Sequence, residues 1–128
     1  DGASAALALE RASFVVAIDQ FLTDSTRLAD VIMPADGFAE KDGTVTNVEG
    51  RVQKINQITP GAGQSRPDWS ILDDVARRMG TDLGLHSAEA INKEIAAVAP
   101  AYAGVTWDLL DWDERDGVVV PHGDDVRA

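Results

Sequence analysis

The chain has 128 residues, of which 45% are hydrophobic, so it can form one domain with a core of its own. Its net charge of −11 argues against non-specific nucleic-acid binding, which needs clustered Lys and Arg, and against docking on an anionic membrane. Cysteine is absent, so the chain can hold neither a disulfide nor an iron–sulfur cluster, which suits a cytoplasmic protein. No run of eighteen apolar residues occurs, and we expect no direct membrane insertion.

The first quarter of the chain predicts two parallel strands joined through a helix. Residues 4–12 are rich in alanine and leucine and are typical of the end of a helix. Continuous apolar runs at 14–18 and 31–33 indicate strands that are buried on both faces. Between them, Thr23 is a candidate N-cap for a short helix over 23–29. Two such strands with a helical connection favour a parallel pair with a right-handed crossover.

The middle of the chain has a different pattern. Over residues 43–58, apolar side chains are spaced by three or four, but Thr, Asn and Gly dominate. We therefore expect irregular extended segments there and no helix. A loop rich in Gly and Pro follows at 60–67. The next helix is expected over 68–79, with Asp68 as its N-cap and Gly80 directly after its end.

The last third predicts one more amphipathic helix and a short strand. The helix is expected over 87–99, and Pro100 stops it. Its apolar positions place four side chains inward: Ala88, Ile91, Ile95 and Val98. Acidic residues crowd 108–116, and 118–120 is a candidate strand.

Together these elements predict an α/β fold in which helices flank a parallel-stranded, Rossmann-like open sheet. We treat residues 1–128 as a single domain fragment. Residues 1–80 form the half that bears motifs at the ligand edge, and 81–128 form a helical and acidic C-terminal extension. The chain starts with Asp-Gly-Ala, without Met, so we expect it to be a partial domain of a larger subunit.

Five motif pieces occur in order along the chain, at 19–23, 28–34, 40–44, 47–53 and 68–69. Their order and spacing resemble the molybdopterin oxidoreductase family, which includes the large subunits of formate dehydrogenases and nitrate reductases. They also resemble the related G subunit of NADH–quinone oxidoreductase. The likeness covers about half of the sequence and becomes weak beyond Gly80.

This resemblance implies a molybdopterin guanine dinucleotide site whose contacts include Ile18, Asp19, Lys41 and Asp68. Ile18 would act through its backbone. The carboxylate of Asp19 ends a strand at the ligand edge of the sheet, and it can accept both adjacent N–H donors of a guanine. Three of these residues also have a structural alternative: Asp19 as the cap of a turn, Lys41 as a partner of Glu40 or Asp42, and Asp68 as the helix N-cap.

Three further residues in the motifs have expected structural roles. Asp30 precedes the second strand, and we expect its carboxylate to bond backbone near a strand start. Asn47 and Arg51 belong to the motif at 47–53, where they could face the cofactor or hold the loop, and we favour holding.

By the resemblance, the chain is part of an electron-transfer oxidoreductase subunit and forms one wall of the cofactor site. We expect no catalytic residue and no metal ligand within it, and iron–sulfur clusters only in other parts of the parent. Its partners would be other domains of the same subunit and other subunits of a redox complex. The location would be cytoplasmic or, through that complex, peripheral to the inner membrane.

The alanine-rich opening favours a parent similar to the G subunit of NADH–quinone oxidoreductase. One alternative is a catalytic subunit similar to formate dehydrogenase, with a live molybdenum site. Another is a structural or interaction module that retains a vestigial cofactor pocket.

Overall fold

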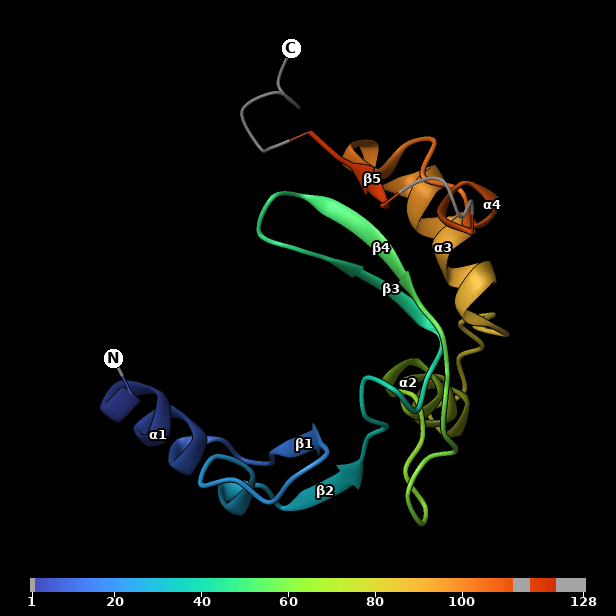
Figure 1. Ribbon diagram of the computed structural model, residues 1–128. Helices are drawn as coiled ribbons and strands as arrows, with labels where there is room; N and C mark the ends of the chain where they lie inside the picture. The colour runs from blue at the N-terminus through green and yellow to red at the C-terminus, as the bar shows by residue number, and fades with distance from the viewer. Residues whose placement is uncertain (1, 112–115, 122–128) are drawn as a thin grey trace.

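The computed structural model describes residues 2–111 and 116–121, and the strands within them form two separate sheets (Figure 1). The parallel sheet contains β1 (Val16–Asp19) and β2 (Val31–Pro34). The antiparallel sheet has the order β3 (Gly43–Thr46), β4 (Arg51–Ile55) and β5 (Val118–Val119). The helices are α1 (Gly2–Arg11), α2 (Asp68–Arg78), α3 (Ala88–Val98) and α4 (Trp107–Leu110), with short 3₁₀ turns η1 (Thr26–Leu28) and η2 (Pro100–Tyr102).

The predicted parallel pair is confirmed, with Val16 opposite Val31 and Asp19 opposite Pro34. The backbone N–H of Val15 donates to the carboxylate of Asp30 over 2.7 Å, which confirms the structural role expected for Asp30. The connection holds the 3₁₀ turn η1, which is shorter than the predicted helix.

A third segment continues the parallel layer beside β2. The N–H of Arg66 donates to Pro34 O over 3.3 Å, and the N–H of Asp36 donates to Arg66 O over 2.9 Å. These bonds form an isolated parallel bridge between Ala35 and Arg66, directly before α2 begins. In the described part of the chain, the parallel layer therefore has two strands and one bridge. It is narrower than the predicted Rossmann-like open sheet, and the other strands form a separate antiparallel sheet.

Strands β3 and β4 form a regular hairpin, so the expectation of irregular segments over 43–58 was wrong for most of that range. The carboxamide oxygen of Asn47 accepts from the backbone N–H groups of Glu49, over 2.9 Å, and Arg51, over 3.0 Å. Gly50 completes the turn with a φ of 76°. The guanidinium of Arg51 donates to Asp116 O over 3.0 Å. Asn47 and Arg51 thus hold the local structure, as expected.

Helix α2 ends as predicted, but it does not begin as predicted. Gly80, with a φ of 89°, donates to Arg77 O, and Thr81 donates to Ala76 O, which is the Schellman arrangement. Asp68 is the first residue of the helix, and the capping position is Pro67, which makes no side-chain capping bond. The prediction of Asp68 as N-cap was therefore wrong, because its carboxylate faces a lysine instead.

Helix α3 is capped by the hydroxyl of Ser87, which accepts from the N–H of Ala90 over 3.0 Å. Its buried face differs from the prediction, since Val98 is exposed and Asn92 is buried. No helix in the described ranges is long and apolar enough to cross a membrane.

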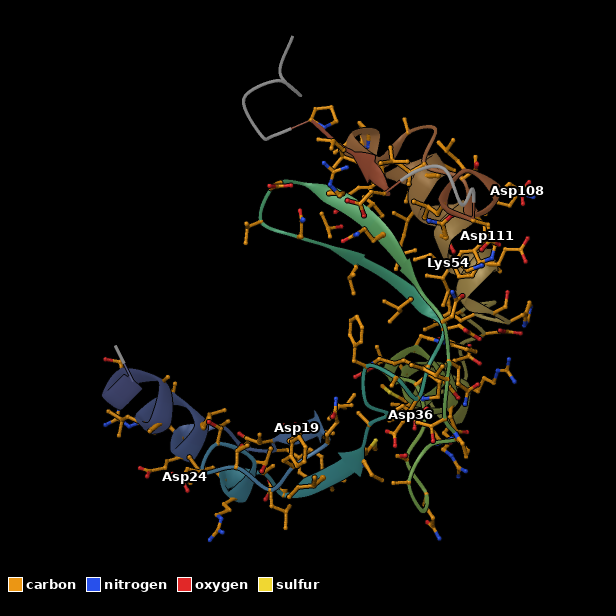
Figure 2. The ribbon with its side chains drawn as sticks, in the orientation of Figure 1. Asp19, Asp24, Asp36, Lys54, Asp108 and Asp111 are labelled. Atoms are coloured by element: carbon orange, nitrogen blue, oxygen red, sulfur yellow. The ribbon has the colours of Figure 1, made fainter. Side chains whose placement is uncertain are left out.

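The main cluster of buried hydrophobic residues lies between β4 and the segments that follow α3. Val52 packs there in one buried cluster with Val105, Leu110 and Val120. Lys54 ties β4 to α4 through an ion pair with Asp111, with Nζ and Oδ1 separated by 2.5 Å (Figure 2). The same ammonium lies 4.5 Å from the ring centre of Trp107, so polar contacts join β4 to α4 beside the hydrophobic cluster.

The parallel strands are open, and the expectation that both faces would be buried was wrong for this chain. Val16 is 47% exposed and Ile32 is 38% exposed. The accessible surface is 8986 Å², against roughly 6,600 Å² for a compact monomer of this mass. Figure 1 shows the reason, because α1, β1 and β2 lie at one end of an open arc and the hairpin lies at the other.

Candidate functional site

Three chain segments leave the parallel layer at the same edge. Asp19 ends β1 directly opposite Pro34, which ends β2. The bridge at Arg66 extends this edge, and α2 begins two residues later with Asp68. Open α/β sheets bind ligands at the carboxyl ends of their parallel strands, so this edge is the expected place for a ligand.

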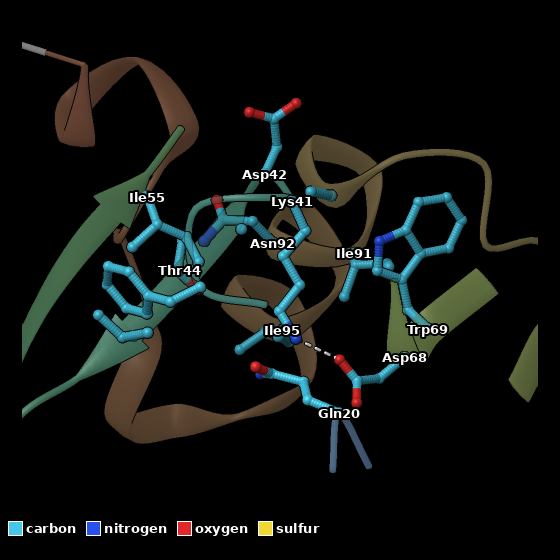
Figure 3. A pocket seen from close by; sticks show the side chains of 14 residues that line it. Gln20, Lys41, Asp42, Thr44, Ile55, Asp68, Trp69, Ile91, Asn92 and Ile95 are labelled. Carbon is cyan, nitrogen blue, oxygen red and sulfur yellow. Dashed lines mark hydrogen bonds and ion pairs between the residues drawn. The ribbon is translucent and has the colours of Figure 1, made fainter. Parts of the chain in front are cut away.

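Lys41 reaches this region from the segment before β3. Its ammonium donates to the carboxylate of Asp68, and the two side chains form an ion pair (Figure 3). The side chain of Lys41 is 23% exposed, so the pair is partly shielded from solvent. Lys41 thus pairs with Asp68 and not with its neighbours Glu40 and Asp42, at least within the residues that the structure describes.

A cavity of about 470 Å³ opens beside this ion pair, and we call it the central cavity. Its walls come from the start of β3, the first turn of α2 and one face of α3 (Figure 3). Most of its lining is apolar and comes from Phe38, Val45, Ile55, Trp69, Ile91 and Ile95. The size and apolar character are those of a small-molecule pocket with a few orienting polar groups.

Asp19 and Ile18 lie at the edge of the sheet but do not line the central cavity. The carboxylate of Asp19 accepts from the N–H of Gln20 over 2.7 Å and from the N–H of Phe21 over 3.3 Å. Asp19 therefore does cap a turn, as its structural alternative proposed. The structure brings Lys41 and Asp68 together at the central cavity. Asp19 does not line this cavity, but the next residue, Gln20, does.

Sequence reasoning missed two polar residues of the cavity, Gln20 and Asn92. Asn92 is only 5% exposed, and its side-chain oxygen has no hydrogen-bond partner in the described part of the chain. It follows Ile91 in a helix whose expected core face held only apolar residues, so a helical pattern alone would not single it out. Gln20 lies in the motif at 19–23, but the predicted ligand contact in that motif was Asp19, the acid directly before it.

The model of the molybdopterin oxidoreductase family matches residues 1–78 of this sequence. The chain belongs to the molybdopterin oxidoreductase family. A protein of Staphylococcus haemolyticus named "Putative formate dehydrogenase" is 42% identical over 119 residues, which is 92% of this chain. Relatives with the same name from two strains of Staphylococcus aureus, USA300 and COL, are 40% identical over the same share. The chain spans about 12% of the length of these relatives.

The family implies a molybdopterin cofactor, and the central cavity fits one part of such a molecule. A molybdopterin oxidoreductase must bind a heterocycle rich in N–H and C=O groups together with phosphate. Lys41, Asp68 and Gln20 offer a donor, an acceptor and an amide that is both, beside apolar walls. The cavity also has Asp42 on its lining, so its carboxylates outnumber its one lysine. These hydrogen-bonding groups suit a heterocyclic ring. They do not suit a phosphate group, because the carboxylates would repel its negative charge.

Proposed function

We propose that this chain forms one wall of a molybdopterin guanine dinucleotide site in the large subunit of a formate dehydrogenase-type oxidoreductase. The main support is the meeting of Lys41 and Asp68 in one cavity beside the edge of the parallel strands. Both residues lie in the part of the chain that the family model matches, and both were expected contacts by resemblance.

Each proposed contact has a defined chemical role. The carboxylate of Asp68 accepts from ring N–H groups, and the ammonium of Lys41 donates to a ring carbonyl, so the pair recognises a ring that carries both. Ile18 contributes backbone groups at the sheet edge. Asp19 orders the turn that follows β1 and has a second carboxylate oxygen for an N–H donor. With the cofactor bound, the apolar walls would shield these bonds from water and strengthen them.

The bound cofactor would supply the redox chemistry through its metal, and this chain would supply binding and orientation. The phosphates need cations or helix amides, which other parts of the parent would provide. Iron–sulfur clusters, if the parent has them, also belong to those parts, because this chain has no cysteine. We do not expect the chain to turn over substrate alone.

The names of the relatives favour a formate dehydrogenase-type parent over one similar to the G subunit of NADH–quinone oxidoreductase. We further propose that the parallel layer extends into a Rossmann-like open sheet in the parent. Its supports are the exposed faces of β1 and β2 and the excess of accessible surface. Other domains of the same subunit would cover these faces, in a cytoplasmic redox complex. An interaction module with a vestigial pocket is the competing proposal.

Metal and nucleotide analysis of the intact parent tests the proposal. After expression with ample molybdenum, we expect molybdenum or tungsten together with a guanine nucleotide. Lys41→Ala and Asp68→Ala should both lower cofactor retention through extended dialysis. Arg78→Ala is a matched control, because Arg78 pairs with Asp74 on the exposed side of α2. Repeated absence of metal from the wild-type parent would favour the interaction module. Equal retention in all variants would refute the contacts.

A further inference from the structure

The side chain of Gln20 lies where the sequence-based expectation placed Asp19. Gln20 lines the central cavity together with Lys41 and Asp68, and Asp19 does not. Figure 3 shows the amide of Gln20 beside the ion pair of Lys41 and Asp68. We infer that Gln20 is a ligand-contacting residue and that its amide recognises a ring edge with an N–H next to a C=O group. This inference rests on the proposed function.

The hydrogen bonds of Asp19 explain why Gln20 lines the central cavity and Asp19 does not. Its Oδ1 accepts from the N–H of Gln20 over 2.7 Å, which directs the carboxylate toward the backbone of the residues that follow it. The next N–H, of Phe21, also donates to Oδ1 over 3.3 Å. These two bonds fix the backbone of Gln20 just past the end of β1. Asp19 then acts as a positioning residue for the amide that follows it.

The loop after β2 contacts the side chain of Gln20 and holds it in place. Nε2 of Gln20 lies 3.5 Å from the carbonyl oxygen of Asp36. A Cβ at Gly37 would lie 3.3 Å from Oε1 of Gln20, closer than most Cβ contacts allow. Gly37 thus leaves the space that the amide needs. As a residue, Gln20 is exposed. One amide hydrogen of Nε2 donates to Asp36 O, so the second amide hydrogen and Oε1 are the groups that can meet a ligand.

The chemistry of the amide decides which ligand it suits. A carboxamide donates through nitrogen and accepts through oxygen, so it can form two bonds with the N–H and C=O of a lactam. Lys41 and Asp68 largely cancel each other's charge, and Asp42 adds a further carboxylate to the lining, so the site suits a neutral ring edge that donates N–H groups. Both heterocycles of the proposed cofactor, pterin and guanine, carry a lactam.

The test uses the intact parent and the variants Gln20→Ala and Gln20→Met. Methionine keeps the length and packing of glutamine but cannot make either hydrogen bond, so it separates contact from folding. The readout is guanine nucleotide released per polypeptide by acid hydrolysis, followed through extended dialysis. We expect both variants to lose the cofactor about tenfold faster than wild type, as the loss of two hydrogen bonds predicts. Gln64→Ala changes a glutamine outside the central cavity and should match wild type.

The outcomes separate this inference from the proposed function. Retention of the cofactor by Gln20→Met at the wild-type rate would overturn the role of Gln20 and leave the proposed site intact. A wild-type parent without molybdenum, tungsten and guanine nucleotide would overturn the proposed function and this inference together. Faster loss in both Gln20 variants, with Gln64→Ala unchanged, supports the contact.

Discussion

The ammonium of Lys41 meets the carboxylate of Asp68, although the two residues lie 27 positions apart in the sequence. This contact joins the segment before β3 to the first turn of α2, and so it links the antiparallel hairpin to the edge of the parallel layer. It is also the feature on which the proposed site depends.

A double-mutant cycle on Lys41 and Asp68 should reveal a coupling free energy of roughly 0.5–1 kcal/mol. The expected value is toward the upper end for exposed pairs because the lysine side chain is only 23% exposed. Hydrogen-exchange mass spectrometry of the parent, read at the start of α2, measures the local opening free energy. Arg78 and Asp74 form the control pair, with side chains that are 78% and 40% exposed. A coupling no larger than that of the control pair would contradict the prediction.

Gly61→Ala should destabilise the loop before α2 by about 1–3 kcal/mol through overpacking. A Cβ at this position would lie 2.3 Å from Oδ1 of Asp36 and 2.8 Å from the hydroxyl of Ser65. Faster hydrogen exchange over 60–66 would report the change. Gly43→Ala is the matched control, since its Cβ would meet Ile55 at an ordinary 3.8 Å. Equal exchange of this loop in the two variants would show that Gly61 is not tightly packed.

Asn92→Leu should stabilise α3 in the cofactor-free parent by about 1 kcal/mol. The substitution keeps a side chain of similar size and removes a buried oxygen that lacks a hydrogen-bond partner among the described residues. We expect the backbone amides of α3 to exchange about fivefold more slowly than in the wild type. Asn56 is exposed, so Asn56→Leu should leave these amides unchanged. Faster exchange in Asn92→Leu would show that the polar group is satisfied.

Asn47→Ala should lower the local opening free energy of the hairpin of β3 and β4 by about 1 kcal/mol. The variant loses the oxygen that accepts from Glu49 and Arg51 across the turn. Asn47→Asp keeps an acceptor at the same place and should retain most of the wild-type protection in hydrogen exchange over 43–55. Equal loosening by both substitutions would mean that the side-chain oxygen does not hold the turn.

The parallel pair could be predicted from the sequence because local signals agree there. Apolar runs at 14–18 and 31–33 specify strands, and the helical connection specifies their direction. Gly80 could be predicted equally well, since its backbone satisfies a carbonyl at the end of α2 that lies close by in the chain. Such features depend only on neighbours in sequence.

The hairpin and the cavity depended on information that the sequence does not show directly. Val45, Val48, Val52 and Ile55 are spaced by three or four, and the two buried residues of β4, Val52 and Ile55, are three positions apart, so the sequence shows no strand-like alternation there. The partner of Asp68 is 27 residues away, so its role could not be separated from capping. Gln20 lines the cavity while the carboxylate of Asp19 accepts from the backbone N–H groups of Gln20 and Phe21, an arrangement that residue type alone does not predict.

The parallel bridge at Arg66 has a consequence for the loop that precedes it. Main-chain bonds to Pro34 and Asp36 fix Arg66, and α2 starts two residues later, so the place of Asp68 does not depend on the path of the loop. A Cβ at Gly63 would meet no atom within 4 Å, which marks the outer part of that loop as open. Related proteins should therefore tolerate insertions and deletions near Gly63 while the acid at the start of the helix keeps its position.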